Sequence, residues 1–369
     1  MVADMTGADS VLAVADATDG QPIRTAIIGY GLAGSVFHAP LIHAVDGLEL
    51  TAVVTGNAER AETARHRYPG VRVFATPEQL WQDADDLDLV VIASPNSAHV
   101  SLALTAIEAG LAVVIDKPLA VSVADGERVR VAAGVTGVLA SVFQNRRWDG
   151  DLLTLRSLIA NGDLGSVHRF ESRFERWRPQ VNTAAWREGG DPAQAGGLLF
   201  DLGSHLVDQA LLVFGPVTSV YAEVRAVRAG AQVDDDVFVA LTHASGTVSH
   251  LWASSAAADL GPRLRVLGSG GSFVKHGLDV QEAALRAGGS PLDAGWGADD
   301  ETAWGVLGTP GDTRRVPTVA GSYETYYAGI RDSLRTGAAP PVTVDEAIAV
   351  LAIIEAARAS ARDHAVITL

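Results

Sequence analysis

The stretch RTAIIGYGLAGSVFHAP, residues 24–40, determines the architecture of the first part of the chain. An apolar, strand-like run ends at Ile28, and Gly29, Gly31 and Gly34 follow with the spacing G-x-G-x-x-G. The first Gly of this pattern permits a tight turn, the second lets the backbone approach a pyrophosphate, and the third lets helix and strand pack closely. Because the pattern lies between a strand and a helix, we prefer a dinucleotide site to an ordinary Gly-rich turn.

Strand-like and helix-like segments alternate after this stretch. Apolar strand-like runs follow at 48–55, 71–76, 87–95, 111–118 and 138–147, with helix-like segments between them at 58–68, 97–110 and 122–134. Such alternation is typical of βαβ units around a parallel sheet that is buried on both faces. We therefore predict a doubly wound Rossmann domain over residues 23–145, preceded by a flexible tail over residues 1–22.

The pattern changes after Trp148. A helix-like segment at 149–165 is followed by strand-like runs at 167–177, 219–227, 236–245, 247–255 and 263–275, with an apolar helix at 196–215. The prediction for residues 146–369 is an α+β domain with a large, mostly antiparallel sheet. It ends in a long helix capped by Thr343 and Glu346. Residues 286–320 are rich in Gly, Pro and Asp and are predicted to form a long loop.

Composition narrows the function classes. The 369 residues include no Cys, which excludes disulfides and thiolate chemistry, and the formal net charge of −16 argues against a nucleic-acid surface. No apolar run reaches the roughly 18 residues of a membrane span, and the N-terminus lacks a basic signal-peptide region. We expect a soluble cytoplasmic protein without membrane or nucleic-acid partners.

The end of the second strand-like run bears on the choice of dinucleotide. An NAD site usually places Asp or Glu there for the ribose 2′-hydroxyl. This chain has Thr55 and Asn57 instead, and Arg60 follows. A carboxylate at the strand end would repel a 2′-phosphate, and its absence there together with a nearby Arg tolerates one. We therefore expect NADP, with NAD as the alternative and a solvated helix face as the other role for Arg60.

Two further stretches carry chemical groups. The fifth strand ends in Asp116-Lys117-Pro118, at the sheet edge where ligands of doubly wound folds collect. The helix 196–215 is apolar, yet Asp201, His205 and Asp208 fall at i, i+4 and i+7, on one helical face.

These motifs resemble the glucose–fructose oxidoreductase and inositol dehydrogenase family of NAD(P)-dependent enzymes. The resemblance extends over nearly the whole chain from Ile23. It rests on G-x-G-x-x-G, on SPNSAH at 94–99, on the strand end IDKP and on GG-x-x-x-D-x-G-x-H at 196–205. The family usually has Glu-Lys-Pro where this chain has Asp116-Lys117-Pro118. Within the family the chain is most similar to the NADP-dependent scyllo-inositol dehydrogenase branch.

The resemblance implies a catalytic trio of Lys117, Asp201 and His205, and the chemistry of these groups agrees with it. Oxidation of a secondary alcohol requires loss of the hydroxyl proton as hydride leaves the carbon. An imidazole with a pKa near ~6.5 suits that base, and an ammonium stabilises the developing alkoxide. Asp201 holds the substrate or orients the imidazole.

Other interpretations of the helix face remain open. Asp and His at i, i+4 also chelate divalent metals, although we expect no metal beside a Lys. The face could be purely structural, or the protein could be a sensor that binds dinucleotide and sugar without turnover. A dehydrogenase of aldoses instead of inositols is a further alternative.

Supporting positions complete the predicted site. The expected cofactor contacts are Gly29, Gly31, Leu32, Ala33, Gly34, Thr55, Asn57, Arg60, Ser94, Pro95, Asn96, His99, Asp116, Lys117 and Asn145. The expected substrate contacts are Arg146, Trp186, Arg187, Asp201 and His205, because a polyol site needs a flat aromatic wall and fork-shaped donors. Arg147 and Trp148 could serve the same site or, just as well, pack the domain junction. Trp296 is predicted either to cover the 286–320 loop or to reach a neighbouring subunit, and we expect a homodimer or homotetramer.

Overall fold

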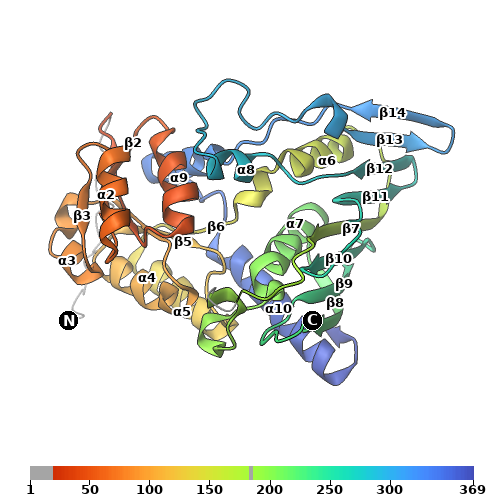
Figure 1. Ribbon diagram of the computed structural model, residues 1–369, viewed down its shortest axis with the longest axis horizontal. Coiled ribbons are helices and arrows are strands. Elements are labelled where there is room, and N and C mark those ends of the chain that lie inside the picture. Colours follow the sequence, from red (N-terminus) through yellow and green to blue (C-terminus); the bar gives the residue numbers. More distant parts are fainter. Residues whose placement is uncertain (1–19, 183–185) are drawn as a thin grey trace, which may run out of the picture.

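Two β-sheets organise the chain in a computed structural model, which describes residues 20–182 and 186–369 (Figure 1). Nearly all of the predicted N-terminal tail lies outside these residues. The two sheets confirm the predicted fold class, a Rossmann domain followed by an α+β domain. Among the helices of the described residues, none is long and apolar enough to cross a membrane.

The first sheet has six parallel strands in the order β3-β2-β1-β4-β5-β6. Its strands are β1 (Ile23–Ile28), β2 (Leu48–Val54), β3 (Arg72–Phe74), β4 (Leu89–Ile92), β5 (Ala112–Asp116) and β6 (Ala140–Phe143). The helices around it are η1 (Ala33–His38), α1 (Ala39–His43), α2 (Ala58–Arg67), α3 (Pro77–Trp81), α4 (His99–Glu108) and α5 (Val123–Thr136). The chain order reverses between β1 and β4, and such a reversal opens a crevice at the carboxyl ends of the strands.

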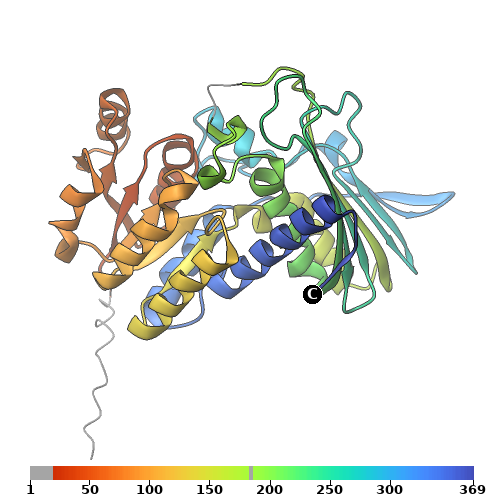
Figure 2. The ribbon, with the colours of Figure 1, turned by 90° about the horizontal axis from the view of Figure 1, so that it is seen from below.

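The second sheet has nine strands in the order β14-β13-β12-β11-β7-β10-β9-β8-β15. Its main strands are β7 (Val167–Glu175), β8 (Val217–Arg225), β9 (Asp236–His243), β10 (Val248–Ser254), β11 (Leu264–Gly268) and β12 (Gly271–Lys275), and the short β15 (Ile367–Thr368) lies at the edge beside β8. All neighbours are antiparallel except β7 and β10, which confirms a mostly antiparallel sheet. Figure 2 shows helices packed on one side of it.

The prediction of a loop throughout 286–320 is wrong in its second half. Strands β13 (Gly305–Thr309) and β14 (Asp312–Val316) form a hairpin that extends the sheet beside β12. The Gly and Pro residues that suggested a loop mark the turn, where Gly311 has a φ of 86°. Leu307 faces the core and is 5% exposed, so burial of one face holds the hairpin in place.

The last helices connect the two domains. The remaining helices are α6 (Gly150–Ala160), η7 (Leu199–Gly203), α7 (Ser204–Phe214), α8 (Gln281–Arg286), α9 (Glu324–Thr336) and α10 (Val344–Asp363). Helix α10 contacts α5 and β6 of the first domain as well as β8 and α7 of the second. It begins at the predicted capping box of Thr343 and Glu346. The C-terminal segment therefore returns across the boundary that the sequence places at residue 145.

Candidate active site

The Gly-rich loop has the shape that a dinucleotide requires. A Cβ on Gly29, whose φ is 99°, would lie 2.5 Å from the Ala93 carbonyl oxygen, and a Cβ on Gly34 would lie 2.0 Å from the Gly29 carbonyl oxygen. Both positions therefore exclude a side chain. A Cβ on Gly31 would meet only Arg60 Nη1 at 3.8 Å, which leaves open space in front of the loop. Leu32, 42% exposed, borders that space. The residues present thus fit a pyrophosphate.

The end of β2 presents hydrogen-bonding groups and no carboxylate. Asn57 caps α2, with its side-chain oxygen accepting from Arg60 N–H at 2.9 Å, and the Thr55 hydroxyl accepts from Asn57 N–H at 3.4 Å. This capping directs the first turn of α2 toward the Gly-rich loop, where the Arg60 guanidinium lies beside Gly31. The predicted residues Thr55, Asn57 and Arg60 are therefore close to the loop.

The loops after β4 and β5 are joined by His99. Its Nδ1 lies 2.8 Å from the Pro118 carbonyl oxygen and its Nε2 lies 3.0 Å from the Ser94 carbonyl oxygen, so both ring nitrogens are occupied. Any effect of His99 on a cofactor is therefore indirect, through the two loops. The Ser94 hydroxyl is buried without a hydrogen-bond partner in the described chain. Asn96 donates to the Gln194 carbonyl oxygen at 2.8 Å and so ties the first domain to the second.

Asp116 and Lys117 stand at the end of β5, before a cis peptide bond to Pro118. The carboxylate of Asp116 accepts from Lys117 N–H at 2.9 Å and lies 3.8 Å from Nε2 of His38. Burial acts to raise the pKa of Asp116, but His38 and Lys117 outweigh it and the pKa is lowered. The shorter Asp in place of the usual Glu thus remains ionised against a buried His.

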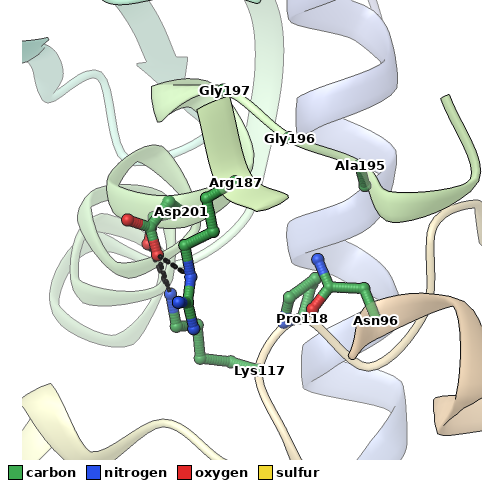
Figure 3. Close-up of a pocket in the computed structure, with 8 residues that line it drawn as sticks. All are labelled: Asn96, Lys117, Pro118, Arg187, Ala195, Gly196, Gly197 and Asp201. Carbon is green, nitrogen blue, oxygen red and sulfur yellow. Dashed lines mark hydrogen bonds and ion pairs between the residues drawn. The ribbon is translucent and has the colours of Figure 1, made fainter. Parts of the chain in front are cut away.

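Lys117 and Asp201 come from different domains and meet in one pocket (Figure 3). Lys117 Nζ donates to Asp201 Oδ1 at 2.8 Å and to the Asp201 carbonyl oxygen at 2.6 Å, while Arg187 Nε lies 3.6 Å from the same carboxylate. Burial raises the pKa of Asp201, but Lys117 and Arg187 reverse this and lower it to about 2. The pocket is lined by Asn96, Lys117, Pro118, Arg187, Ala195, Gly196, Gly197 and Asp201.

His205 follows Asp201 along the same helical segment and is 5% exposed. Its Nδ1 lies 3.1 Å from the side-chain oxygen of Gln144. Burial, followed by the charges of Lys117, Arg146 and Arg263, lowers the pKa of His205 well below its ordinary value. The imidazole is therefore neutral at pH 7. Lys117 is thus one of the charges that act on His205.

Asp208 does not share the pocket with Asp201, contrary to the expectation of one functional face. Residues Leu199–Gly203 form a π-helical turn, so the regular spacing that we expected does not hold through Asp201. Asp208 instead accepts two hydrogen bonds from Arg147, at 2.7 and 2.9 Å, in a buried ion pair. Arg147 also reaches Glu346, and the Trp148 ring lies 5.7 Å from that of Tyr326. Arg147 and Trp148 thus pack the domain junction, one of the two alternatives that the sequence left open.

The remaining predicted residues divide between the pocket and its surroundings. Arg146 is 6% exposed, and its guanidinium is held by Glu282 at 2.5 Å and Asp149 at 3.5 Å. Asn145 is 6% exposed at the end of β6. The side chain of Trp186 lies outside the described residues. Trp296 donates to Glu324 within the same chain, at 2.9 Å.

Two site residues escaped the sequence analysis. Gln144, which contacts His205, follows β6 directly, and the rule that ligands collect at strand carboxyl ends could have indicated it. Arg176 follows β7, and its N–H donates to the Ser254 carbonyl oxygen at 2.8 Å. Its guanidinium has no hydrogen bond or ion pair within the described residues, and its charge acts on Asp201. Only the tertiary structure brings the charge of Arg176 to bear on Asp201.

Metal-binding groups do not gather at this site. Within residues 20–182 and 186–369, no cluster of three or more His, Asp or Glu side chains has an arrangement that could hold a metal ion. Asp201 has Lys117 as its neighbour, and an ammonium repels a divalent cation.

Comparison with known proteins identifies the family. A family model described as "Oxidoreductase family, NAD-binding Rossmann fold" matches residues 23–144, and one described as "Oxidoreductase family, C-terminal alpha/beta domain" matches residues 156–369. The chain is 39% identical to scyllo-inositol 2-dehydrogenase (NADP(+)) IolW of Bacillus subtilis (strain 168), over 94% of this chain and 96% of that protein. It is 41% identical to the uncharacterized oxidoreductase YdgJ of Escherichia coli (strain K12), over 94% and 99%.

Solved structures agree with the sequence comparison. The putative oxidoreductase yvaA from Bacillus subtilis superimposes with a TM-score of 0.90 at 38% identity, covering 95% of this chain and 99% of that one. The chain therefore belongs to the GFO/IDH/MocA family of oxidoreductases, with an NAD-binding Rossmann domain. Membership of this family accounts for the Gly-rich loop, the Asp116-Lys117-Pro118 strand end and the two-domain architecture.

Proposed function

We propose that the protein is an NADP-preferring dehydrogenase that oxidises a secondary alcohol of a cyclitol or sugar, with scyllo-inositol as the first candidate. One observation carries the proposal: Lys117 from the first domain and Asp201 from the second form an ion pair in a pocket at the carboxyl edge of the Rossmann sheet, and His205 follows Asp201 by four residues on the same helical segment. The named B. subtilis relative supports the substrate class.

The proposed roles follow from the protonation states of the side chains. Neutral His205 accepts the hydroxyl proton, while the ammonium of Lys117 donates to the same oxygen and stabilises the negative charge that develops on it. Asp201, ionised and one-third exposed, accepts hydrogen bonds from neighbouring substrate hydroxyls. The bound nicotinamide would supply the hydride acceptor. In the reverse direction His205 returns the proton to the carbonyl oxygen.

The substrate contacts proposed from the sequence were Arg146, Trp186, Arg187, Asp201 and His205, and we add Arg176. A guanidinium that is partly buried without a counter-ion gains more from a ligand than one already paired. Within residues 20–182 and 186–369 Arg176 has no ion-pair partner, whereas Glu282 and Asp149 already hold Arg146. Arg176 and Arg187 would donate to hydroxyl oxygens of the substrate.

A substrate panel tests the function. The full chain is mixed with NADP and with inositol isomers, aldoses and sugar alcohols, and the absorbance of reduced nicotinamide is followed. We expect turnover with at least one inositol. Turnover with aldoses alone would identify an aldose dehydrogenase instead of an inositol dehydrogenase. Tight ligand binding without turnover across the panel would favour a sensor that binds dinucleotide and sugar.

Cofactor preference is a separate prediction. Arg60 lies beside the Gly-rich loop with no carboxylate at the end of β2, so kcat/KM should be higher with NADP than with NAD. Arg60→Ala should lower kcat/KM for NADP by about 10- to 100-fold, the value of a charge-assisted hydrogen bond, and leave that for NAD nearly unchanged. Steady-state kinetics with both cofactors decides this. Arg65→Ala, one turn further along the same helix, is the matched control.

The lowered pKa of His205 predicts opposite pH dependences for the two directions. Oxidation needs the neutral imidazole, which persists as the pH falls until the lowered pKa is reached. The acid limb of kcat/KM for oxidation should therefore lie below pH 6.5, the ordinary pKa of His. Reduction needs the imidazolium, so its rate should fall as the pH rises through the neutral range. Acid limbs at or above pH 6.5 for oxidation would contradict this account.

The uncovered face of the second sheet is the proposed contact between subunits. It carries the aromatic cluster of Phe238, His250 and Trp252, with Arg173 stacked 3.9 Å over the Trp252 ring. A sheet face with aromatic side chains is the kind of surface that homodimers bury. Analytical ultracentrifugation of the full chain and of Trp252→Glu measures whether this face joins two copies.

A further inference from the structure

The ring of His205 is held by a single side chain. Gln144 and His205 are 2% and 5% exposed, and the Gln144 side-chain oxygen lies 3.1 Å from His205 Nδ1. No second hydrogen-bond partner of the imidazole occurs in the parts of the chain that the structure describes. The backbone of Gln144 is held directly after β6, because its N–H donates to the Val142 carbonyl oxygen at 2.9 Å and its carbonyl oxygen accepts from Arg147 N–H at 3.1 Å. The orientation of the imidazole therefore depends on Gln144.

An amide oxygen accepts hydrogen bonds and cannot donate them. The nitrogen that faces it must then carry the proton of the neutral ring. We infer that Gln144 is a positioning residue, which holds His205 as the Nδ1–H tautomer and leaves the lone pair of Nε2 free to act as the base. The catalytic meaning of this inference rests on the proposed function, whereas the tautomer itself does not.

The neutral amide also explains how the base avoids a strong charge partner. The charged groups that act on His205 are Lys117, Arg146 and Arg263, and all three disfavour the imidazolium. The carboxylates on the same helical segment are already paired, Asp201 with Lys117 and Asp208 with Arg147. A carboxylate in place of Gln144 would stabilise the imidazolium and raise the pKa of the base. An amide orients the ring without adding charge, so the protonated ring returns its proton readily.

The first test measures the tautomer directly. The full chain is labelled with ¹⁵N-histidine, and the His205 signals are assigned by comparison with His205→Asn. We expect a protonated Nδ1 and an unprotonated Nε2 at neutral pH, and a mixture of tautomers in Gln144→Leu. A protonated Nε2 in the wild-type protein would mean that the amide nitrogen of Gln144, and not its oxygen, faces Nδ1 of the ring. That result would overturn the inference whether or not the substrate panel finds turnover.

The second test uses kinetics with a substrate found in the panel. Gln144→Leu should lower kcat about tenfold or more, the effect of losing a buried hydrogen bond, and leave the KM for NADP unchanged. Gln144→Glu should recover much of kcat and shift the acid limb of the oxidation profile to higher pH, because a carboxylate both accepts from Nδ1–H and stabilises the imidazolium.

A matched control separates positioning from general destabilisation. Gln281 is also a buried glutamine; it donates to the Trp148 carbonyl oxygen at 3.1 Å and accepts from Tyr323 N–H at 2.7 Å. Gln281→Leu should lower the melting temperature without moving the pH profile. If Gln144→Glu leaves the profile unmoved, or if Gln144→Leu retains wild-type kcat, Gln144 does not position the base.

Discussion

Lys117→Ala and His205→Ala are each expected to lower kcat by about 10²- to 10⁴-fold, the range that general acid–base and electrostatic groups contribute. Among the described residues, Lys117 contributes the only ammonium that contacts Asp201, and His205 is the base in the proposed oxidation. Folding should survive both changes, because Arg187 still lies 3.6 Å from the Asp201 carboxylate and loss of one imidazole removes only one hydrogen bond. Stopped-flow and steady-state rates measure the effect, and fluorescence titration with NADP checks that the cofactor still binds.

A matched control for His205 is available in the second domain. His243 is also buried, at 2% exposed, but its ring nitrogens lie 2.8 Å from the Gly215 carbonyl oxygen and from the Ser249 hydroxyl, away from the pocket. His243→Ala should reduce stability and spare kcat. Near-wild-type turnover in Lys117→Ala or His205→Ala would contradict the assigned roles.

Asp208→Ala should cost about 3–5 kcal/mol of unfolding free energy, the usual result of removing one partner of a buried ion pair. Arg147 and Asp208 have side chains 6% and 2% exposed, and Arg147 would keep only Glu346 at the edge of the junction. The pair joins the end of the Rossmann domain to α7, so its loss weakens the contact between domains. Urea denaturation measures the free energy of unfolding. The Asp208→Ala protein that remains folded should have a kcat within a few-fold of the wild-type value.

Asp201→Ala provides the contrast on the same helical segment. The Asp201 side chain is 33% exposed, so its removal should cost little stability while lowering turnover sharply. If the two substitutions gave the same loss of stability and the same loss of kcat, the separation of Asp208 from the site would be wrong. Asp208→Asn, which keeps an acceptor for Arg147, should be less damaging than Asp208→Ala.

The sequence was sufficient to predict those structural features that depend on residues close together in the chain. The Gly29–Gly34 turn, the alternation of strands and helices, and the capping box of Thr343 and Glu346 are all local. Gly110 is another such case, because it ends the preceding helix in the αL conformation, with a φ of 76°. Each of these features is fixed by backbone sterics or by hydrogen bonds within one or two turns, and those interactions can be inferred from neighbouring letters.

Pairings between distant residues could not be assigned in this way. The helix segment that carries Asp201, His205 and Asp208 presents each to a different partner: Lys117, Gln144 and Arg147. These partners depend on how the second domain docks against the ends of β5 and β6, and on the π-helical turn that changes the spacing of the segment. A periodic sequence pattern identifies a polar face. Only the packing of the two domains determines which cation each carboxylate meets, because electrostatic pairing requires proximity in space and not in sequence.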